Sequence, residues 1–251
     1  MLKKVRPLLL FISTLIFIYS AIMLTSHLYN LYKNNRNYKK LKDIYNIEQN
    51  FNSQEDSPNL DDLRKEKFNK LQEINKDIVG WIYIPNTKID YPVVKTSDNE
   101  FYLNRDVEKK TNKAGAIFMD YRNSLDENFN IKDKNTVLYG HHMKDGSMFA
   151  DLKKFKSQDF FNENRYIYLD TKDGRKKYEI FSVFITKTDF NYIKSQFNNE
   201  KDFTDFSKSI QEKSSISADI KLSNNDEFLT LSTCTYEFDD GRLALVGRLV
   251  K

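Results

Sequence analysis

The chain is poor in the residues that build covalent or metal-held frameworks. Its 251 residues include one cysteine, Cys234, and three histidines, two of which are adjacent. A single cysteine excludes an internal disulfide and a multi-cysteine metal site, and so few imidazoles are a poor match to an all-histidine zinc site. No carboxylate cluster has the spacing of a calcium loop. We therefore predict that the protein uses no metal and no cofactor.

The composition also lacks a strong charge bias. There are 40 Lys and Arg against 36 Asp and Glu, a net charge of only +4, which argues against a nucleic-acid partner. Seven glycines and four prolines are too few for a collagen-like or Gly/Pro-rich disordered chain. In contrast, 19 Phe and 15 Tyr predict a packed aromatic core. The length suits one ordinary domain with appendages, or two small domains.

Long hydrophobic runs are absent except near the N-terminus. Residues 8–24 carry no charge and follow a short basic segment; as a helix they would extend about 25 Å, slightly less than a membrane's hydrocarbon core. A membrane anchor, a cleaved signal peptide and a buried core helix all fit such a run. We favour an anchor because no small-x-small cleavage site follows, and we predict a cytoplasmic tail over residues 1–7 and a transmembrane helix over residues 8–28. Basic residues flank both ends, so the positive-inside rule does not decide the orientation.

The rest of the chain changes from helical to strand periodicity near residue 79. Apolar residues recur at helical spacing over 31–47 and 60–78, and we predict a helical stalk and linker over residues 29–58 before a globular domain over residues 59–251. Eight short strands with few helices favour a mainly β fold, a closed or nearly closed β-barrel. The strands are predicted near 81–85, 89–94, 116–119, 136–139, 165–171, 175–186, 227–233 and 242–250, and further helices over 147–155 and 203–213.

Cys234 ends an apolar strand and is followed by polar residues. A lone cysteine in a strand is commonly an inert small hydrophobe, but a residue at a strand end can face a cleft. A hairpin joining the last two strands would bring Arg242 back beside Cys234. A guanidinium there can stabilise a thiolate or an oxyanion, so the pair is a candidate for nucleophilic catalysis.

A cysteine nucleophile also needs a proton partner. His27 lies at the end of the apolar run, whereas His141 and His142 follow Gly140 at the end of another predicted strand. An isolated histidine pair is commonly a surface feature or a core hydrogen-bonding group. The joint pattern of histidine, cysteine and arginine at three strand ends favours a catalytic interpretation.

Three sets of residues occur in order along the globular part: Asp77–Ile82 with Tyr91–Val94, Leu138–Phe149, and Thr230–Cys234 with Gly241–Arg242. Together they resemble the first strand pair, the histidine segment and the active-site strand of the sortases, and most closely those of class B. The long insertion over residues 189–218 also fits class B, which carries a helix there. The resemblance implies an eight-stranded sortase-type β-barrel with N-terminal helices and a helix between strands 6 and 7, spanning the predicted catalytic domain.

The resemblance further implies a single-pass, membrane-anchored cysteine transpeptidase on the extracellular face of a Gram-positive cell membrane. Its partners would be surface proteins with a C-terminal sorting motif, cleaved at Thr through a thioester, and an amine of peptidoglycan or its lipid-linked precursor. By the same resemblance, Cys234 is the nucleophile, His141 the acid and base, and Arg242 the residue that positions substrate and stabilises the oxyanion. His142 has no assigned role. Asn99, Leu103 and Ser232 resemble residues of the family's substrate groove.

Three alternative functions stay open at this point. A membrane-anchored cysteine peptidase would use the same residues but release the acyl group to water, and a pilus-polymerising sortase would transfer it to another protein. A surface-anchored barrel used for binding or scaffolding would not need Cys234 at all. Formation of an adduct with an amine acceptor would distinguish transpeptidation from hydrolysis by a peptidase. Dependence of that adduct on Cys234 would distinguish it from a binding or scaffolding barrel.

Overall fold

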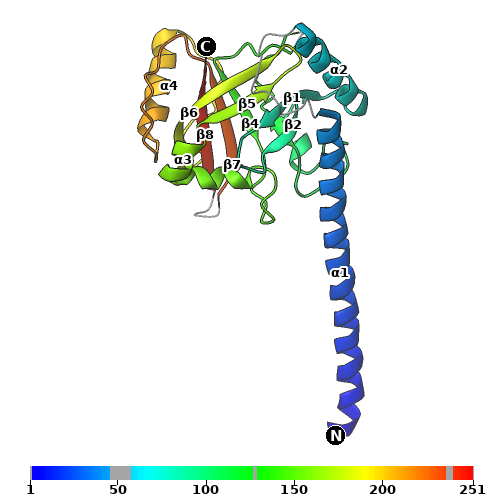
Figure 1. Ribbon diagram of the computed structural model, residues 1–251. Coiled ribbons are helices and arrows are strands. Elements are labelled where there is room, and N and C mark those ends of the chain that lie inside the picture. Colours follow the sequence, from blue (N-terminus) through cyan, green and yellow to red (C-terminus); the bar gives the residue numbers. More distant parts are fainter. Residues whose placement is uncertain (1, 46–57, 127–128, 236–239, 251) are drawn as a thin grey trace. The chain divides into compact units, whose positions relative to one another are not determined.

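The computed structural model of the protein describes residues 2–45, 58–126, 129–235 and 240–250 (Figure 1). The chain divides into two compact units, one ending at Asp43 and the other beginning at Ile44. Residues 46–57 of the helical stalk and linker predicted over residues 29–58 lie outside the described residues. The domain limits drawn from the sequence stay predictions.

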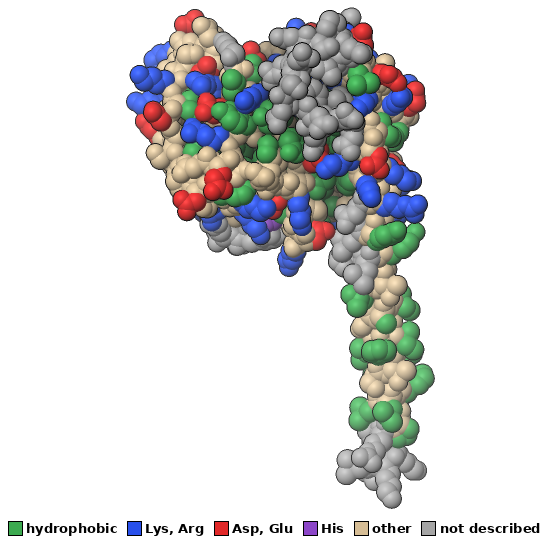
Figure 2. Space-filling view, viewed as in Figure 1, with side chains coloured by type: hydrophobic (Ala, Val, Ile, Leu, Met, Phe, Trp, Pro, Cys, Tyr) green, Lys and Arg blue, Asp and Glu red, His purple; other side chains and the backbone are tan. Residues whose placement is uncertain are grey.

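The first unit is the greater part of α1, a continuous helix from Leu2 to Tyr45. The sequence predicted two helical segments here, and they join because the stretch contains no glycine and its one proline, Pro7, lies near the helix start. Over Leu9–Ser26 the mean hydropathy is 2.1 and none of the window is buried; Figure 2 shows apolar side chains exposed along this helix. The helix has the length and exposure of a membrane span or a signal sequence, and not of a core helix.

The second unit is built on a closed β-barrel, which confirms the predicted fold class. Around the barrel the strands follow the order β1-β2-β3-β4-β7-β8-β6-β5. Two neighbouring pairs are parallel, β2 with β3 and β4 with β7, so β4 and β7 end at the same edge of the barrel. The strands are β1 (Ile78–Tyr83), β2 (Asp90–Val94), β3 (Ile117–Met119), β4 (Asn135–Tyr139), β5 (Tyr166–Asp170), β6 (Arg175–Thr186), β7 (Phe228–Cys234) and β8 (Arg242–Leu249).

Helices connect and flank these strands: α2 (Pro58–Ile74), η1 (Phe101–Leu103), η2 (Ala150–Lys156), α3 (Gln158–Glu163) and α4 (Glu200–Glu212). Figure 1 shows α2 and α4 on opposite flanks of the barrel. The helix expected between strands 6 and 7 is α4. It begins where the Asn199 side chain accepts a hydrogen bond from the Asp202 amide.

The apolar face of α4 covers the outer face of the sheet formed by β6, β7 and β8. The helix contributes Phe203, Phe206 and Ile210 to a buried, largely aromatic cluster between it and the sheet. On β7 the covered face starts at Phe228, and side-chain alternation continues it through Thr230 and Ser232 to Cys234. This outer face of β7 is therefore apolar under α4 and becomes polar toward the strand end.

The helix predicted over residues 60–78 ends earlier, at Ile74. Asn75 turns the chain there, because its backbone carbonyl accepts from the Ile78 amide at 3.1 Å and its side chain accepts from the Asp77 amide at 3.0 Å. Ile78 consequently opens β1 instead of closing the helix.

The helix predicted over residues 147–155 is wrong at its start and in its type. Met148 has a φ of 57° and pairs with His142 in an isolated bridge. Because this left-handed conformation interrupts a right-handed helix, only the 3-10 helix η2 forms, from Ala150.

Candidate active site

The hairpin expected between the last two strands is present, and Cys234 and Arg242 are its final directly opposed pair. Residues opposed in this way have Cα atoms about 4.5–5.5 Å apart. The Thr235 amide donates to the Gly241 carbonyl at 3.0 Å and continues the ladder toward the turn; turn residues 236–239 lie outside the described part. Cys234 is exposed and Arg242 is half-buried, so the thiol is accessible to a substrate.

The histidines enter from β4, the parallel neighbour of β7. The last pair in register is Tyr139 with Ser232, and the Gly140 amide then donates to the Ser232 carbonyl at 3.2 Å. Extending this register by two residues sets His141 level with Cys234. His142 is close as well, with Nδ1 at 3.3 Å from the Cys234 carbonyl oxygen.

The ring of His141 is held by the backbone of η1. Its Nε2 lies 2.7 Å from the Leu103 carbonyl oxygen. A carbonyl can only accept, so Nε2 carries the hydrogen and Nδ1 is the nitrogen whose protonation can change. Gly115, with a φ of +61°, allows this close approach because a Cβ there would lie 2.8 Å from the Leu103 carbonyl and 3.1 Å from the His141 ring.

Ser232 does not present a free hydroxyl. It is 2% exposed, and its Oγ lies 2.8 Å from the hydroxyl of Tyr192, which comes from the segment between β6 and α4. Burial raises the pKa of Tyr192 above its usual value, although the hydrogen bond with Ser232 and the charge of Arg242 offset part of that rise, and a negative charge on Cys234 would add to it. The Tyr192 hydroxyl is therefore close enough to sense both members of the Cys234–Arg242 pair.

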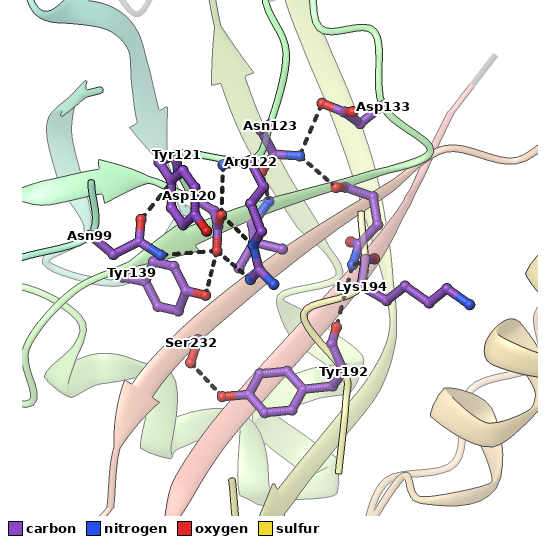
Figure 3. Close-up of polar contacts among 12 residues, drawn as sticks. Asn99, Asp120, Tyr121, Arg122, Asn123, Asp133, Tyr139, Tyr192, Lys194 and Ser232 are labelled. Carbon is purple, nitrogen blue, oxygen red and sulfur yellow. Dashed lines mark hydrogen bonds and ion pairs between the residues drawn. The ribbon is translucent and has the colours of Figure 1, made fainter. Parts of the chain in front are cut away.

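The other two substrate-groove candidates occupy different places. Leu103 contributes its carbonyl to His141, and its side chain is exposed. Asn99 donates from Nδ2 to Asp120 at 3.2 Å and accepts from the Tyr121 amide at 3.0 Å (Figure 3). Within the described residues, no three His, Cys, Asp or Glu side chains are grouped as a metal site.

Sequence reasoning missed several residues that surround these groups. Tyr139 is the last residue of β4, two residues before His141, and Asp120 and Arg122 lie one and three residues after the end of β3. All three were visible as polar residues at or near strand ends. Tyr192 lies within the long insertion, where nothing in the sequence distinguishes it from its aromatic neighbours.

Comparisons with known proteins agree with this arrangement. The family model for the sortase domain matches residues 82–250. The chain is 37% identical over 222 residues to sortase B of Listeria monocytogenes, covering 88% of this chain and 87% of that protein. Among solved structures, a mutant form of Clostridium perfringens sortase B has a TM-score of 0.78 at 34% identity, over 86% of this chain and 98% of that one. A Staphylococcus aureus sortase B–substrate complex has a TM-score of 0.76 at 34% identity, over 87% and 97%.

The chain belongs to the sortase family, whose members are cysteine transpeptidases. The curated relatives and the solved structures that it resembles are sortases of class B, and this is the class that the sequence motifs indicated. The protein is accordingly an enzyme that anchors other proteins to the cell wall by transpeptidation.

Proposed function

We propose that Cys234, His141 and Arg242 carry out the transpeptidation, as nucleophile, acid and base, and oxyanion-stabilising residue. The observation that carries this assignment is the pairing of exposed Cys234 with Arg242 across the β7–β8 hairpin. His141 supports it, since it follows β4 at the same edge of the barrel with one ring nitrogen already held by Leu103.

In the first half-reaction, the Cys234 thiolate attacks the carbonyl carbon of the Thr at which a sorting signal is cleaved. A C–S bond forms and the carbonyl electron pair moves onto the oxygen, where the Arg242 guanidinium stabilises the negative charge. As the oxyanion collapses, the C–N bond breaks, and protonated His141 gives a proton from Nδ1 to the departing amine. A thioester on Cys234 remains.

In the second half-reaction, an amine attacks the thioester carbonyl. Neutral His141 accepts a proton from that amine at Nδ1, because Nε2 is engaged with the Leu103 carbonyl. Collapse of the second oxyanion breaks the C–S bond and returns the thiolate. The product is the anchored protein, joined to the acceptor by a new amide bond.

We further propose that the substrates are surface proteins with a C-terminal sorting motif, and that the acceptor is an amine of peptidoglycan or its lipid-linked precursor. The structure of the Staphylococcus aureus relative with its substrate supports the first of these. The apolar stretch Leu9–Ser26 supports attachment to the cell membrane through one span. Because the proposed acceptor belongs to the cell wall, the catalytic domain would lie on the extracellular face. Such an anchor would keep the enzyme where both substrates occur and raise their effective concentration. Asn99, Leu103 and Ser232 would lie beside the bound peptide.

The assignment is tested by incubating the full chain in detergent micelles with a sorting-signal peptide, with and without triglycine. We expect a peptide–triglycine adduct that disappears in Cys234→Ala. Cleavage without any adduct at saturating triglycine would instead support hydrolysis, which the relatives do not favour. Unchanged adduct formation in Cys234→Ala would refute the nucleophile.

A further inference from the structure

A buried carboxylate lies beside the active-site edge of the barrel and plays no part in the chemistry described so far. Asp120 follows β3 and is 1% exposed. Arg122 donates to it from Nε at 2.9 Å and from Nη2 at 2.7 Å, and the Tyr139 hydroxyl donates at 2.7 Å. With Asn99, these residues form what we call the Asp120 cluster (Figure 3).

Asp120 is charged within this cluster. Burial by itself would raise the pKa of the carboxyl, but hydrogen bonds from Arg122 and Tyr139 lower it below its usual value. Burial, and then the Asp120 charge, raise the pKa of Tyr139, which keeps the phenol protonated as the donor. The cluster is therefore a fixed arrangement of donors around one anion.

Tyr139 is the member of the Asp120 cluster that lies nearest in the sheet to the Cys234 strand end. Tyr139 is the β4 residue paired with Ser232, which lies two residues before Cys234. Paired residues on parallel strands share a face, so Tyr139 lies on the outer face that leads to the thiol. Figure 3 shows its ring between Asn99 and Ser232, with the hydroxyl directed at Asp120.

We propose that Asp120 is a positioning residue for transpeptidation. It holds the side chains of Tyr139 and Asn99 in the orientation in which they contact the sorting-signal peptide. Asp120 itself touches neither the peptide nor the thiol. The inference rests on the active site proposed above, but it concerns the binding of peptide on this face and not the identity of the nucleophile.

A purely structural role is the competing explanation, and the molecule contains a matched control. Asp170, 2% exposed, accepts from Arg175 Nε and Nη2 at 2.7 Å each and from the hydroxyl of Tyr45. We call this set the Asp170 cluster. Asp170 is the last residue of β5, whose neighbours in the barrel are β1 and β6. The Asp170 cluster therefore lies away from the β4–β7 edge.

The experiment compares Asp120→Asn with Asp170→Asn in the full chain in detergent micelles. Each change keeps the side-chain shape and removes the charge that orients the arginine and tyrosine donors. We measure kcat and KM for sorting peptide with triglycine, and the rate at which iodoacetamide alkylates Cys234, a reaction that needs no peptide site. For Asp120→Asn we expect kcat/KM to fall about tenfold, mainly through KM, with alkylation unchanged. For Asp170→Asn we expect wild-type kcat/KM.

Tyr139→Phe provides a second route to the same answer if Asp120→Asn does not fold. It removes only the hydroxyl that Asp120 holds, and we expect it to raise KM. Where Asp120→Asn folds, the double variant should have a kcat/KM no lower than that of Asp120→Asn alone. The inference is overturned if Asp120→Asn keeps wild-type kcat/KM, if both Asn variants lose it equally, or if Tyr139→Phe leaves KM unchanged. A loss of alkylation in Asp120→Asn would also overturn it, whereas activity in Cys234→Ala would instead refute the proposed nucleophile.

Discussion

The Asp120 and Asp170 clusters use the same chemistry at two places in the barrel. In each, a nearly inaccessible carboxylate accepts two side-chain bonds from one arginine and one from a tyrosine hydroxyl, and Asp120 also accepts one from Asn99. They differ in what the tyrosine does next. Tyr139 lies beside Ser232 on the face that leads to Cys234, while Tyr45 stacks on Trp81 with ring centres 4.2 Å apart. The neighbours of a hydrogen-bonded cluster, more than its bonds, decide whether it serves the reaction or the fold.

The largest effect should come from the active-site edge itself. Replacing His141 with Ala removes the group that protonates the leaving amine, and we expect acyl-enzyme formation to fall about a hundredfold or more. His142→Ala is the matched control, because its Nδ1 lies 3.3 Å from the backbone carbonyl oxygen of Cys234, and its effect should be milder. Rapid-quench assays of both variants make the comparison; equal losses would mean that the catalytic histidine is misassigned or that both act.

Arg242→Lys should have the next largest effect. An ammonium group keeps the charge but not the planar fork of donors, so we expect kcat/KM to fall about a hundredfold with little change in thermal stability. Turnover close to wild type, measured with the same peptide and triglycine, would remove Arg242 from the mechanism. A matching Arg175→Lys variant should retain turnover, since its cluster lies on other strands.

Asp170→Asn should lower the stability of the fold, which distinguishes the Asp170 cluster from the Asp120 cluster. Loss of its charge removes the ion pair with Arg175, whose side chain is 31% exposed, and we expect a cost of about 2 kcal/mol in the free energy of unfolding. The one tryptophan, Trp81, stacks on Tyr45 of this cluster. Its fluorescence should therefore shift in Asp170→Asn and not in Asp120→Asn, and an emission shift in both would show that the clusters are not independent.

The smallest expected effect is on thermal stability at acidic pH. The folded pKa of Asp120 lies below its usual value of 3.8, so its charge stabilises the folded state fully above about pH 4 and this contribution is lost as the pH falls through the folded pKa. The difference in melting temperature between wild type and Asp120→Asn should stay constant from pH 7 to about pH 5 and shrink below pH 4. A difference that grows on acidification would have the wrong sign for an ion-paired carboxylate.

The sequence was informative where local patterns decide the structure. The change from helical to strand patterns near residue 79 predicted the positions of all eight strands, and the short separation between Cys234 and Arg242 predicted the hairpin that pairs them. The glycine before His141 marked the end of β4. Each of these features depends on neighbours in the chain or on one turn.

What the sequence could not predict depends on contacts between distant segments. The Tyr192–Ser232 and Tyr45–Asp170 bonds join residues 40 and 125 positions apart, and no periodicity reveals such pairs. The two clusters look alike in sequence, since each is an Asp with an Arg a few residues later. Only the barrel order sets one beside Ser232 and the other beside Trp81.

The most direct test of the account is the mass of the enzyme itself during turnover. With sorting peptide and no acceptor, intact-mass and peptide-mapping measurements should find the acyl fragment as a thioester on Cys234, and adding triglycine should remove it as adduct appears. No acyl species in wild type while adduct forms, or an acyl group on any other residue, would contradict the proposed nucleophile and the mechanism built on it.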